Sequence, residues 1–582
     1  MDPENQWILL PSGIYAHVAD YKLHGVPEYD CNPLLQALPA VLEEHEFFER
    51  VQSYPSSTSE ERNQSPRTRH QFVHRLTGPI PNLHFYHLTP NLKPVVNGYF
   101  HPLPEHIGIY DAINGAIMQG YIARGIYSPK DAERAQQIHG AAVQKAGHNL
   151  AQFISASSSA HGNILIGLSG CGKTTAVLRA LSVYPQVIYH PEYDFLQLVY
   201  LVVNCPHAGS IKELCLFVFR EVDRTFGLAG KKSYANKYSI STTSEGTLLA
   251  EVAAIADKYR LGLLFIDELQ NLTAAKKELP ERMLNYFVNL VNIGIPVFQA
   301  GTRRAAKLLR GSLSKARRAG GVQWGRILDK EDWSNFIQSL FESQWTRTPT
   351  PYTAEIGEAF VKECKFIPDL AIKLHKACQW RAIADGGDEI ITAKLLGEVA
   401  QEIFINLRPL LDSIQDNNSE NIDLYEDLLD NFDIEEFRET CSQKTKKRES
   451  DELHRRSKER RKKEEEIVLK QQFLTKALYE LDETLDSFLV KACVEKALES
   501  NPKEEDLQSL ITAAHKLALD SLVSKFSNVA NKKQSKAVLE YRENDLRLIT
   551  KKAQESNISE FEVLQSYGIF MDPVEKFLVQ NG

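Results

Sequence analysis

The stretch at residues 167–175, GLSGCGKTT, constrains the fold of this chain more than any other feature. It satisfies the pattern G-x-x-x-x-G-K-[ST], in which successive backbone N–H groups turn inward and cradle phosphates. A short apolar stretch, residues 162–166, precedes it, and a helical pattern, residues 174–181, follows it. This order of strand, glycine-rich loop and helix predicts a nucleotide site. The alternative is a glycine-rich turn that binds nothing.

The loop offers a partner to each part of a nucleotide's phosphate chain. Lys173 is expected to reach the β- and γ-phosphates, and the hydroxyl of Thr174 is expected to bind Mg²⁺. The full set of expected nucleotide-binding residues is Gly167, Ser169, Gly170, Cys171, Gly172, Lys173, Thr174 and Thr175.

Length and composition set broad limits. A chain of 582 residues is too long for one compact core, so about two to four domains are expected. No apolar run reaches the length of a membrane span, and the first residues, MDPENQWILLPSG, lack the features of a signal peptide. We therefore expect a cytoplasmic protein with no membrane partner. The net charge of −8 argues mildly against nucleic acid as a partner, but binding depends on local patches of positive charge and not on the average over the chain.

The eight cysteines are scattered, without a C-x-x-C pair or histidines at zinc-like spacing. Reduced and mostly buried thiols are therefore expected.

Strands and helices alternate between residues 161 and 302, which is typical of an α/β fold with a parallel sheet covered by helices on both faces. Expected strands are 163–167, 187–190, 197–205, 261–267 and 297–301, and expected helices are 173–182, 210–226, 245–259 and 281–293.

The flanking regions differ in character. Residues 53–69 are polar and have almost nothing to bury, which predicts a linker or exposed loop. Residues 333–411 read as helical throughout and predict a small all-α lid. Residues 444–466 are almost wholly charged, as in a solvated helix or a flexible tether, and the tail after them carries amphipathic helical patterns.

Two adjacent carboxylates end the buried strand at residues 261–267. Asp267 is expected to ligate Mg²⁺, and Glu268 to orient and deprotonate an attacking water. The carboxyl ends of parallel strands face the ligand, so Thr302, at the end of the next strand, is expected to contact the γ-phosphate or the water. Gln270 is a weaker candidate for a neighbouring polar contact. A helix cap or turn role is the alternative for both.

Cationic residues follow in two groups. Arg303 and Arg304 precede a helix-like stretch, SLSKARRAGG, that contains Arg317 and Arg318. An arginine from a neighbouring subunit can stabilise the charge that develops in phosphoryl transfer. Lys212, Lys231, Lys232 and Lys237 suit contacts with DNA phosphates without base reading. A solvated cationic surface is the alternative for both groups.

The order of these motifs resembles an AAA+ ATPase, and several segments are more narrowly similar to TnsC, the ATP-dependent regulator of Tns-type transposons. These segments lie between about residue 32 and about residue 392 and read NPLLQALP, GYIARGIYSP, QVIYHPEY, VNCPHAGSIKELC, LGLLFIDELQNL, MLNYFVNLVNIGIPVFQAGT, KARRAGG and IPDLAIKLHKACQWRAIADGGDEIIT. They favour TnsC over its relatives TniB, IstB and MuB.

The resemblance implies ATP and Mg²⁺ as ligands of Lys173, Thr174 and Asp267, with Thr302 as the first sensor and Arg317 or Arg318 as the arginine finger. It also implies a ring or short filament of this chain on duplex DNA in a prokaryotic cytoplasm. The implied partners are a TnsB-like transposase, a TnsA-like endonuclease and a TnsD- or TniQ-like target selector. The second-sensor arginine common in such lids is absent from residues 366–370.

Together with the resemblance, these features predict an N-terminal extension for partner contacts (1–105), an AAA+ core (106–330), an α-helical lid (331–411), a charged linker (412–470) and a helical tail for transposase and endonuclease contacts (471–582). Three other functions stay open: a helicase-loading replication ATPase, a signalling NTPase that oligomerises without DNA, and a structural scaffold built on the charged tail.

Overall fold

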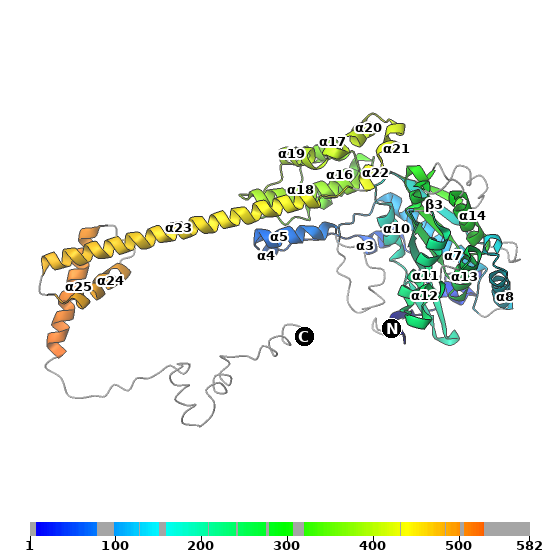
Figure 1. Cartoon of the computed structure of the whole chain (residues 1–582), viewed down its shortest axis with the longest axis horizontal. Helices are drawn as coiled ribbons and strands as arrows, with labels where there is room; N and C mark the ends of the chain where they lie inside the picture. The colour runs from blue at the N-terminus through cyan, green and yellow to red at the C-terminus, as the bar shows by residue number, and fades with distance from the viewer. Residues whose placement is uncertain are drawn as a thin grey trace, which may run out of the picture. The chain divides into compact units, whose positions relative to one another are not determined.

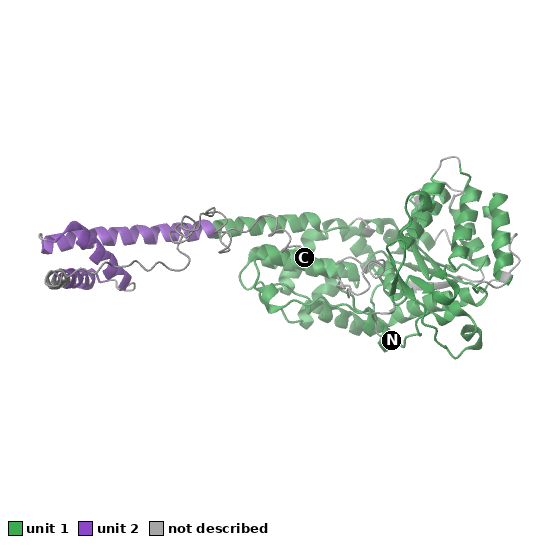
Figure 2. Ribbon diagram, turned by 90° about the horizontal axis from the view of Figure 1, so that it is seen from below, with its two compact units in different colours: residues 1–452 green, residues 453–582 purple. Residues whose placement is uncertain are grey.

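The computed structural model describes eleven stretches of the chain (Figure 1). They are residues 7–77, 98–126, 129–150, 159–207, 209–239, 243–274, 279–306, 319–430, 432–482, 485–500 and 506–528. Two compact units are present, residues 1–452 and residues 453–582 (Figure 2). Within the described stretches, no helix is both long enough and apolar enough to cross a bilayer.

The larger unit is built on a five-stranded sheet with the order β6-β7-β8-β3-β9. All neighbouring strands in it are parallel. Their bounds are β3 (Gly162–Gly167), β6 (Tyr200–Asn204), β7 (Leu263–Asp267), β8 (Val297–Gly301) and β9 (Ala319–Trp324). Because the strands are parallel, their carboxyl ends meet at one edge of the sheet, where ligands bind in open α/β folds.

Helices cover both faces of this sheet. Along β7, Leu263 and Phe265 belong to one hydrophobic cluster, and Leu264 and Ile266 belong to another. The first cluster includes α7 (Pro104–Ile122) and α10 (Lys173–Leu181). The second includes α8 (Pro129–Val143), α11 (Ile211–Phe226), α13 (Glu245–Lys258) and α14 (Leu279–Asn292). The predicted α/β fold is therefore confirmed.

A second sheet corrects the assignment of two expected strands. Its order is β1-β2-β4-β5, with β1 (Trp7–Leu9), β2 (Tyr15–Val18), β4 (Val187–His190) and β5 (Phe195–Leu198). Residues 187–190 thus lie outside the main sheet, and the expected strand 197–205 is divided between β5 and β6. The four residues between β4 and β5 permit only an antiparallel hairpin, because parallel neighbours need a long crossover.

The lid is helical, as predicted. It contains α16 (Lys330–Phe341), α17 (Ala354–Cys364), α18 (Pro368–Asp385), α19 (Ala393–Ile403) and α20 (Arg408–Gln415) (Figure 1). Trp333, Trp345 and Trp380 are among its fully buried side chains.

The interpretation of residues 53–69 as a linker is wrong. The segment forms α4 (Ser59–Arg62) and leads into α5 (Pro66–Phe72), which packs against α18. Arg69 is fully buried and donates to both carboxylate oxygens of Glu389 beyond α18, at 2.7 Å for the Nη2–Oε1 pair. Composition treats polar side chains as exposed, whereas here a buried polar side chain holds the segment in place.

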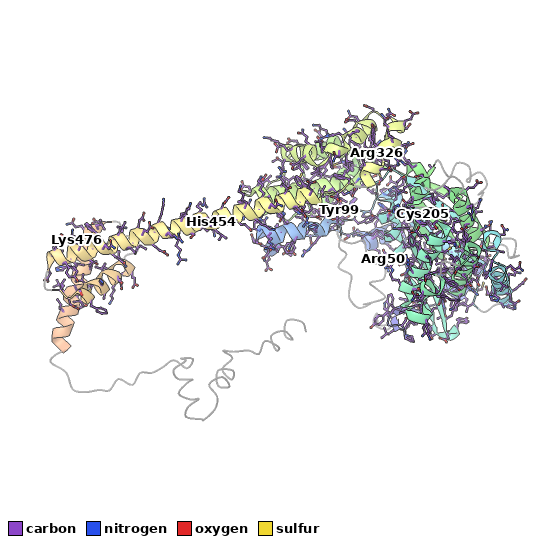
Figure 3. All side chains as sticks on the ribbon, in the orientation of Figure 1. Arg50, Tyr99, Cys205, Arg326, His454 and Lys476 are labelled. Carbon is purple, nitrogen blue, oxygen red and sulfur yellow. The ribbon has the colours of Figure 1, made fainter. Side chains whose placement is uncertain are left out.

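The long helix α23 (Glu435–Leu481) contains the charged stretch 444–466. All side chains from 450 to 469 are exposed, as expected for a solvated helix; His454, on this stretch, is labelled in Figure 3. Within the smaller unit, Leu478 of α23, Val494 of α24 (Ser487–Ser500) and Ala514 of α25 (Leu507–Asn528) share a small core.

The buried pair of Arg69 and Glu389 gives a stability prediction. Replacing Arg69 with Ala leaves the Glu389 carboxylate, 1% exposed, without its countercharge. We expect the free energy of unfolding to fall by about 3–5 kcal/mol, as measured by urea denaturation. Lys394→Ala, which removes an exposed ion pair with Glu398, is the control and should change little. Equal effects of the two substitutions would contradict the stabilising role of the buried pair of Arg69 and Glu389.

Candidate nucleotide site

The glycine-rich loop between β3 and α10 has a backbone that only glycine supports at three points. Gly170 and Gly172 have φ of +73° and +82°, in the left-handed region. At Gly167 a Cβ atom would lie 2.0 Å from the carbonyl oxygen of Trp324 at the end of β9. The loop conformation is therefore set by these glycines and by the neighbouring strand.

Side chains fix the loop from both sides. Trp324 Nε1 donates to the carbonyl of Cys171 at 2.6 Å, and Lys173 Nζ donates to the carbonyls of Gly167 and Leu168, each at 2.9 Å. Lys173 is only 8% exposed, so its ammonium lies within the loop. Burial raises the pKa of the Cys171 thiol to about 12, so this cysteine stays protonated and unreactive.

The two expected Mg²⁺ ligands are in direct contact. Thr174 Oγ1, at the start of α10, donates to Asp267 Oδ2 at 2.6 Å. Burial raises the pKa of Asp267, although hydrogen bonds from Thr174 and from the Glu268 backbone oppose that shift. A hydroxyl and a carboxylate therefore lie side by side at the end of β7, and Mg²⁺ binds oxygen ligands of both kinds.

Glu268 is held by a residue that sequence reasoning missed. Its backbone has φ of +56°, and its N–H donates to Asp267 Oδ1 at 2.8 Å. Asn271 Nδ2 donates to Glu268 Oε2 at 3.3 Å and to the carbonyl of Cys205 at 2.7 Å. Asn271 lies in the short 3₁₀ helix Leu269–Ala274 that follows β7, three residues after Glu268. The three-residue spacing between Glu268 and Asn271 was the feature of the sequence that could have identified Asn271.

Thr302 follows β8 and is 2% exposed. Its backbone N–H donates to Gln270 Oε1 at 3.2 Å, so the weaker candidate Gln270 does contact this site. Thr302 Oγ1 is buried and has no hydrogen-bond partner among the described residues. Because a buried hydroxyl without a partner is costly, this group is suited to a ligand.

A cavity of about 450 Å³ joins these groups. Besides the loop, Asp267, Glu268 and Thr302, its lining includes Ile372 and an aromatic end that the sequence did not predict: Phe100, His101, His106 and Phe336. Tyr99, labelled in Figure 3, donates its hydroxyl to the carbonyl of Phe336 at 2.6 Å and so ties this segment to the lid. Burial lowers the pKa of His106 to about 4, so its ring is neutral.

The lid meets the loop through backbone. The N–H of Asp369, at the start of α18, donates to the carbonyl of Gly170 at 3.2 Å, and Ile372 of the same helix lines the cavity. Asp369 also forms an ion pair with Lys373 at 2.8 Å. Residues 366–370, which lack a second-sensor arginine, thus still touch the loop.

The structure describes two of the four expected arginines. Arg303 forms an ion pair with Asp423 at 3.3 Å, and Arg304 forms one with Asp427. Both contacts lie within the same chain. Arg317 and Arg318 lie outside the described residues.

The four lysines do not form one cluster. Lys212 is exposed at the start of α11, on the edge of the sheet that carries the site, whereas Lys231, Lys232 and Lys237 are exposed beyond the end of α11. A helix of 16 residues separates the two groups by about 24 Å.

The residues present fit a magnesium nucleotide. The loop N–H groups and the start of α10 suit phosphates, and Thr174 and Asp267 suit Mg²⁺. Thr302, whose buried hydroxyl has no hydrogen-bond partner in the part of the chain that the structure describes, lines the same cavity. The aromatic end suits a flat, partly apolar group such as a base.

Part of the chain resembles a known protein family and several solved structures. Residues 158–309 match the family described as AAA domain. A Walker-type ATPase of Pyrococcus abyssi is 14% identical, with a TM-score of 0.29, over 50% of this chain and 76% of that one. RuvB of Thermotoga maritima is 15% identical, with a TM-score of 0.27, over 49% and 74%.

The ORC1 protein of Aeropyrum pernix, solved in complex with DNA, is 13% identical, with a TM-score of 0.29. The likeness covers 46% of this chain and 65% of that one, less than two thirds of its length. None of the curated proteins compared matches the sequence. From the sheet, the loop and the family match, the chain contains an AAA-type P-loop ATPase domain.

The hydrogen bond from Asn271 to Glu268 gives a kinetic prediction. Asn271→Ala removes the side chain that orients the carboxylate, and a misplacement of about 1 Å is enough to lower kcat by about ten- to a hundredfold. The Kd for ATP should stay within about twofold, because Asn271 does not line the cavity. Asn292→Ala, at an exposed position, is the control. An Asn271→Ala enzyme with unchanged kcat would refute the positioning role.

Proposed function

We propose that this chain hydrolyses ATP to ADP and phosphate in the cavity between β3, β7, β8 and the lid. The observation that carries the proposal is the convergence of Thr174, Asp267, Glu268 and Thr302 on one cavity beside the glycine-rich loop. Each comes from the carboxyl end of a parallel strand or from the helix that follows it.

Each group has a distinct task in this proposal. Lys173 and the loop N–H groups bind the phosphates, and Thr174 with Asp267 holds Mg²⁺, which neutralises charge on the phosphates. Glu268 takes a proton from the attacking water, and Thr302 donates its hydroxyl to the phosphate or to that water. His106 and Phe100 border the base. The arginine finger remains assigned to Arg317 or Arg318.

We further propose that the ATPase is a TnsC-like regulator of transposition. Bound ATP would hold copies of the chain together as a ring or filament on duplex DNA, and hydrolysis would dismantle the assembly. This form would link a TnsD- or TniQ-like target selector to a TnsB-like transposase and a TnsA-like endonuclease.

Support for this finer proposal comes from contacts of two segments outside the AAA match with one segment inside it. Asn32, in NPLLQALP, donates to the carbonyls of Tyr121 and Arg124, in GYIARGIYSP, at 2.8 Å each. Arg124 Nη1 in turn donates to the carbonyl of Leu261, at the start of LGLLFIDELQNL, at 2.8 Å. Three segments that resemble TnsC thus share one buried hydrogen-bond network that leads to the strand of Asp267.

Two substitutions test the chemistry. Lys173→Ala removes the buried ammonium and should abolish ATP binding, as measured by titration with a fluorescent ATP analogue. Glu268→Gln keeps the shape but not the base, so binding and assembly should persist while hydrolysis falls by about 10²–10⁴-fold. If the Gln variant hydrolyses ATP at the parent rate, another group activates the water.

Electron microscopy tests the assembly. With a non-hydrolysable ATP analogue and Mg²⁺, we expect rings or filaments that depend on duplex DNA. Their absence would exclude both the transposition regulator and the helicase loader. A neighbouring gene for a transposase would separate those two functions.

The salt dependence of DNA binding tests the lysines. Each lysine that contacts a phosphate adds a slope of about 1 to the plot of log K against log salt concentration. Lys231→Ala with Lys232→Ala should therefore reduce the slope by about 2. Lys212→Ala, at the other end of α11, is measured alongside. Unchanged slopes in both would remove these lysines from the interface.

A further inference from the structure

The twelve residues 419–430, SENIDLYEDLLD, carry five carboxylates and no basic side chain. We call them the acidic segment. They form α21 (Ser419–Tyr425) and α22 (Asp427–Asp430) and connect the lid to α23 in sequence. Ile422 and Leu429 are buried in the core of the larger unit, so the segment is docked on it.

One carboxylate of the acidic segment lies on the phosphate-binding loop. Glu426 is fully buried, and its Oε1 accepts a hydrogen bond from the backbone N–H of Ser169 at 3.1 Å. Ser169 is a residue of the loop and lines the cavity. A carboxylate therefore makes, from within the chain, a contact of the kind that the loop offers to a phosphate.

The acidic segment is also held from the side of Thr302. Arg304 Nε donates to the carbonyl of Asp423 and Nη2 to that of Leu424, each at 2.9 Å, and Nη1 pairs with Asp427. Arg303 pairs with Asp423 at 3.3 Å. The two arginines directly after the proposed sensor thus bind the segment that reaches the loop.

Physical chemistry favours an anion at this place. Burying a carboxylate is costly unless hydrogen bonds or positive charge compensate it. The loop N–H groups and the start of α10 supply positive potential, which is the reason that such loops bind phosphates. The same potential stabilises Glu426, so a carboxylate and a phosphate have a common preference for the loop.

We propose that the acidic segment is an intramolecular latch on the nucleotide site. In the latched conformation Glu426 occupies the loop N–H of Ser169, and Asp423 and Asp427 neutralise Arg303 and Arg304. Binding of a nucleoside triphosphate displaces Glu426 from the loop. The latch then opens and frees the arginine pair for contacts with another subunit. This inference rests on the proposed nucleotide-binding function of the site.

The latch imposes a cost on nucleotide binding. If only a fraction of the molecules is open, the apparent Kd exceeds the intrinsic Kd by the inverse of that fraction. Substitutions that weaken the latch should therefore tighten nucleotide binding. If the acidic segment instead stabilised the loop in its binding-competent form, the same substitutions would weaken nucleotide binding.

Affinity measurements on the full chain separate these outcomes. The Kd of a fluorescent ATP analogue with Mg²⁺ is measured by titration. Glu426→Gln should bind the analogue about tenfold more tightly, since an open fraction of about one tenth gives that factor. Asp423→Asn with Asp427→Asn, which weakens the latch away from the loop, should act in the same direction. Glu420→Gln, an exposed carboxylate of α21, is the matched control and should change nothing.

Hydrogen exchange gives a readout that does not depend on hydrolysis. Saturation with the analogue should speed amide exchange in residues 419–430 of the unsubstituted chain, and should leave it unchanged in Lys173→Ala. Unchanged or weaker binding by both folded latch variants, or slower exchange in this segment, would overturn the latch. If Glu426→Gln fails to fold, the Asp423 and Asp427 double variant decides. If the unsubstituted chain binds no nucleotide, the proposed function itself fails.

Discussion

The close approach of β3 and β9 at Gly167 is the constraint on which the nucleotide site depends. The two strands pair in register from Gly162 with Ala319 to Gly167 with Trp324, and any side chain at Gly167 would collide with the Trp324 carbonyl. Because β9 runs alongside β3 to its end, the indole of Trp324 reaches the Cys171 carbonyl and fixes the loop. The start of α10, and with it Thr174, is then placed against Asp267.

Burial makes these few polar contacts decisive. Lys173, Asp267 and Thr302 are all less than a tenth exposed. In such surroundings a satisfied hydrogen bond is strong and an unsatisfied group is costly. Lys173 and Asp267 have partners within the chain, whereas the hydroxyl of Thr302 has none among the described residues. Lys173 and Asp267 are thus held by contacts within the chain, whereas the hydroxyl of Thr302 is the group to which a ligand would bind.

The loop, the paired Asp267 and Glu268, and Thr302 were predictable because each signal is local. A glycine-rich loop between strand and helix, or a polar residue after an apolar strand, needs no knowledge of distant contacts. The parallel character of the sheet and the helical lid followed from the same kind of local pattern, whereas the strand order did not. Strand β9 was missed because its glycines give no alternating pattern, and its register depends on β3.

Other misses have a different physical cause. Arg69 lies in a segment whose polar composition resembles a linker, and only its partner Glu389, 320 residues away, explains its burial. The aromatic end of the cavity likewise has a role that arises from contacts made in the folded chain. Pairing across such distances leaves no mark on either segment alone.

The groups proposed to bind Mg²⁺ and activate water lie within residues 158–309, whereas several segments outside that match reach the same loop or cavity. They include the aromatic stretch around Phe100, Trp324 of β9, the start of α18 and Glu426. A loop built to bind anions attracts a negative group in any state of the protein, because its N–H groups remain unsatisfied otherwise. With a carboxylate on a segment that also binds two arginines, this chain can link the departure of one anion to the exposure of positive charge elsewhere on the same unit.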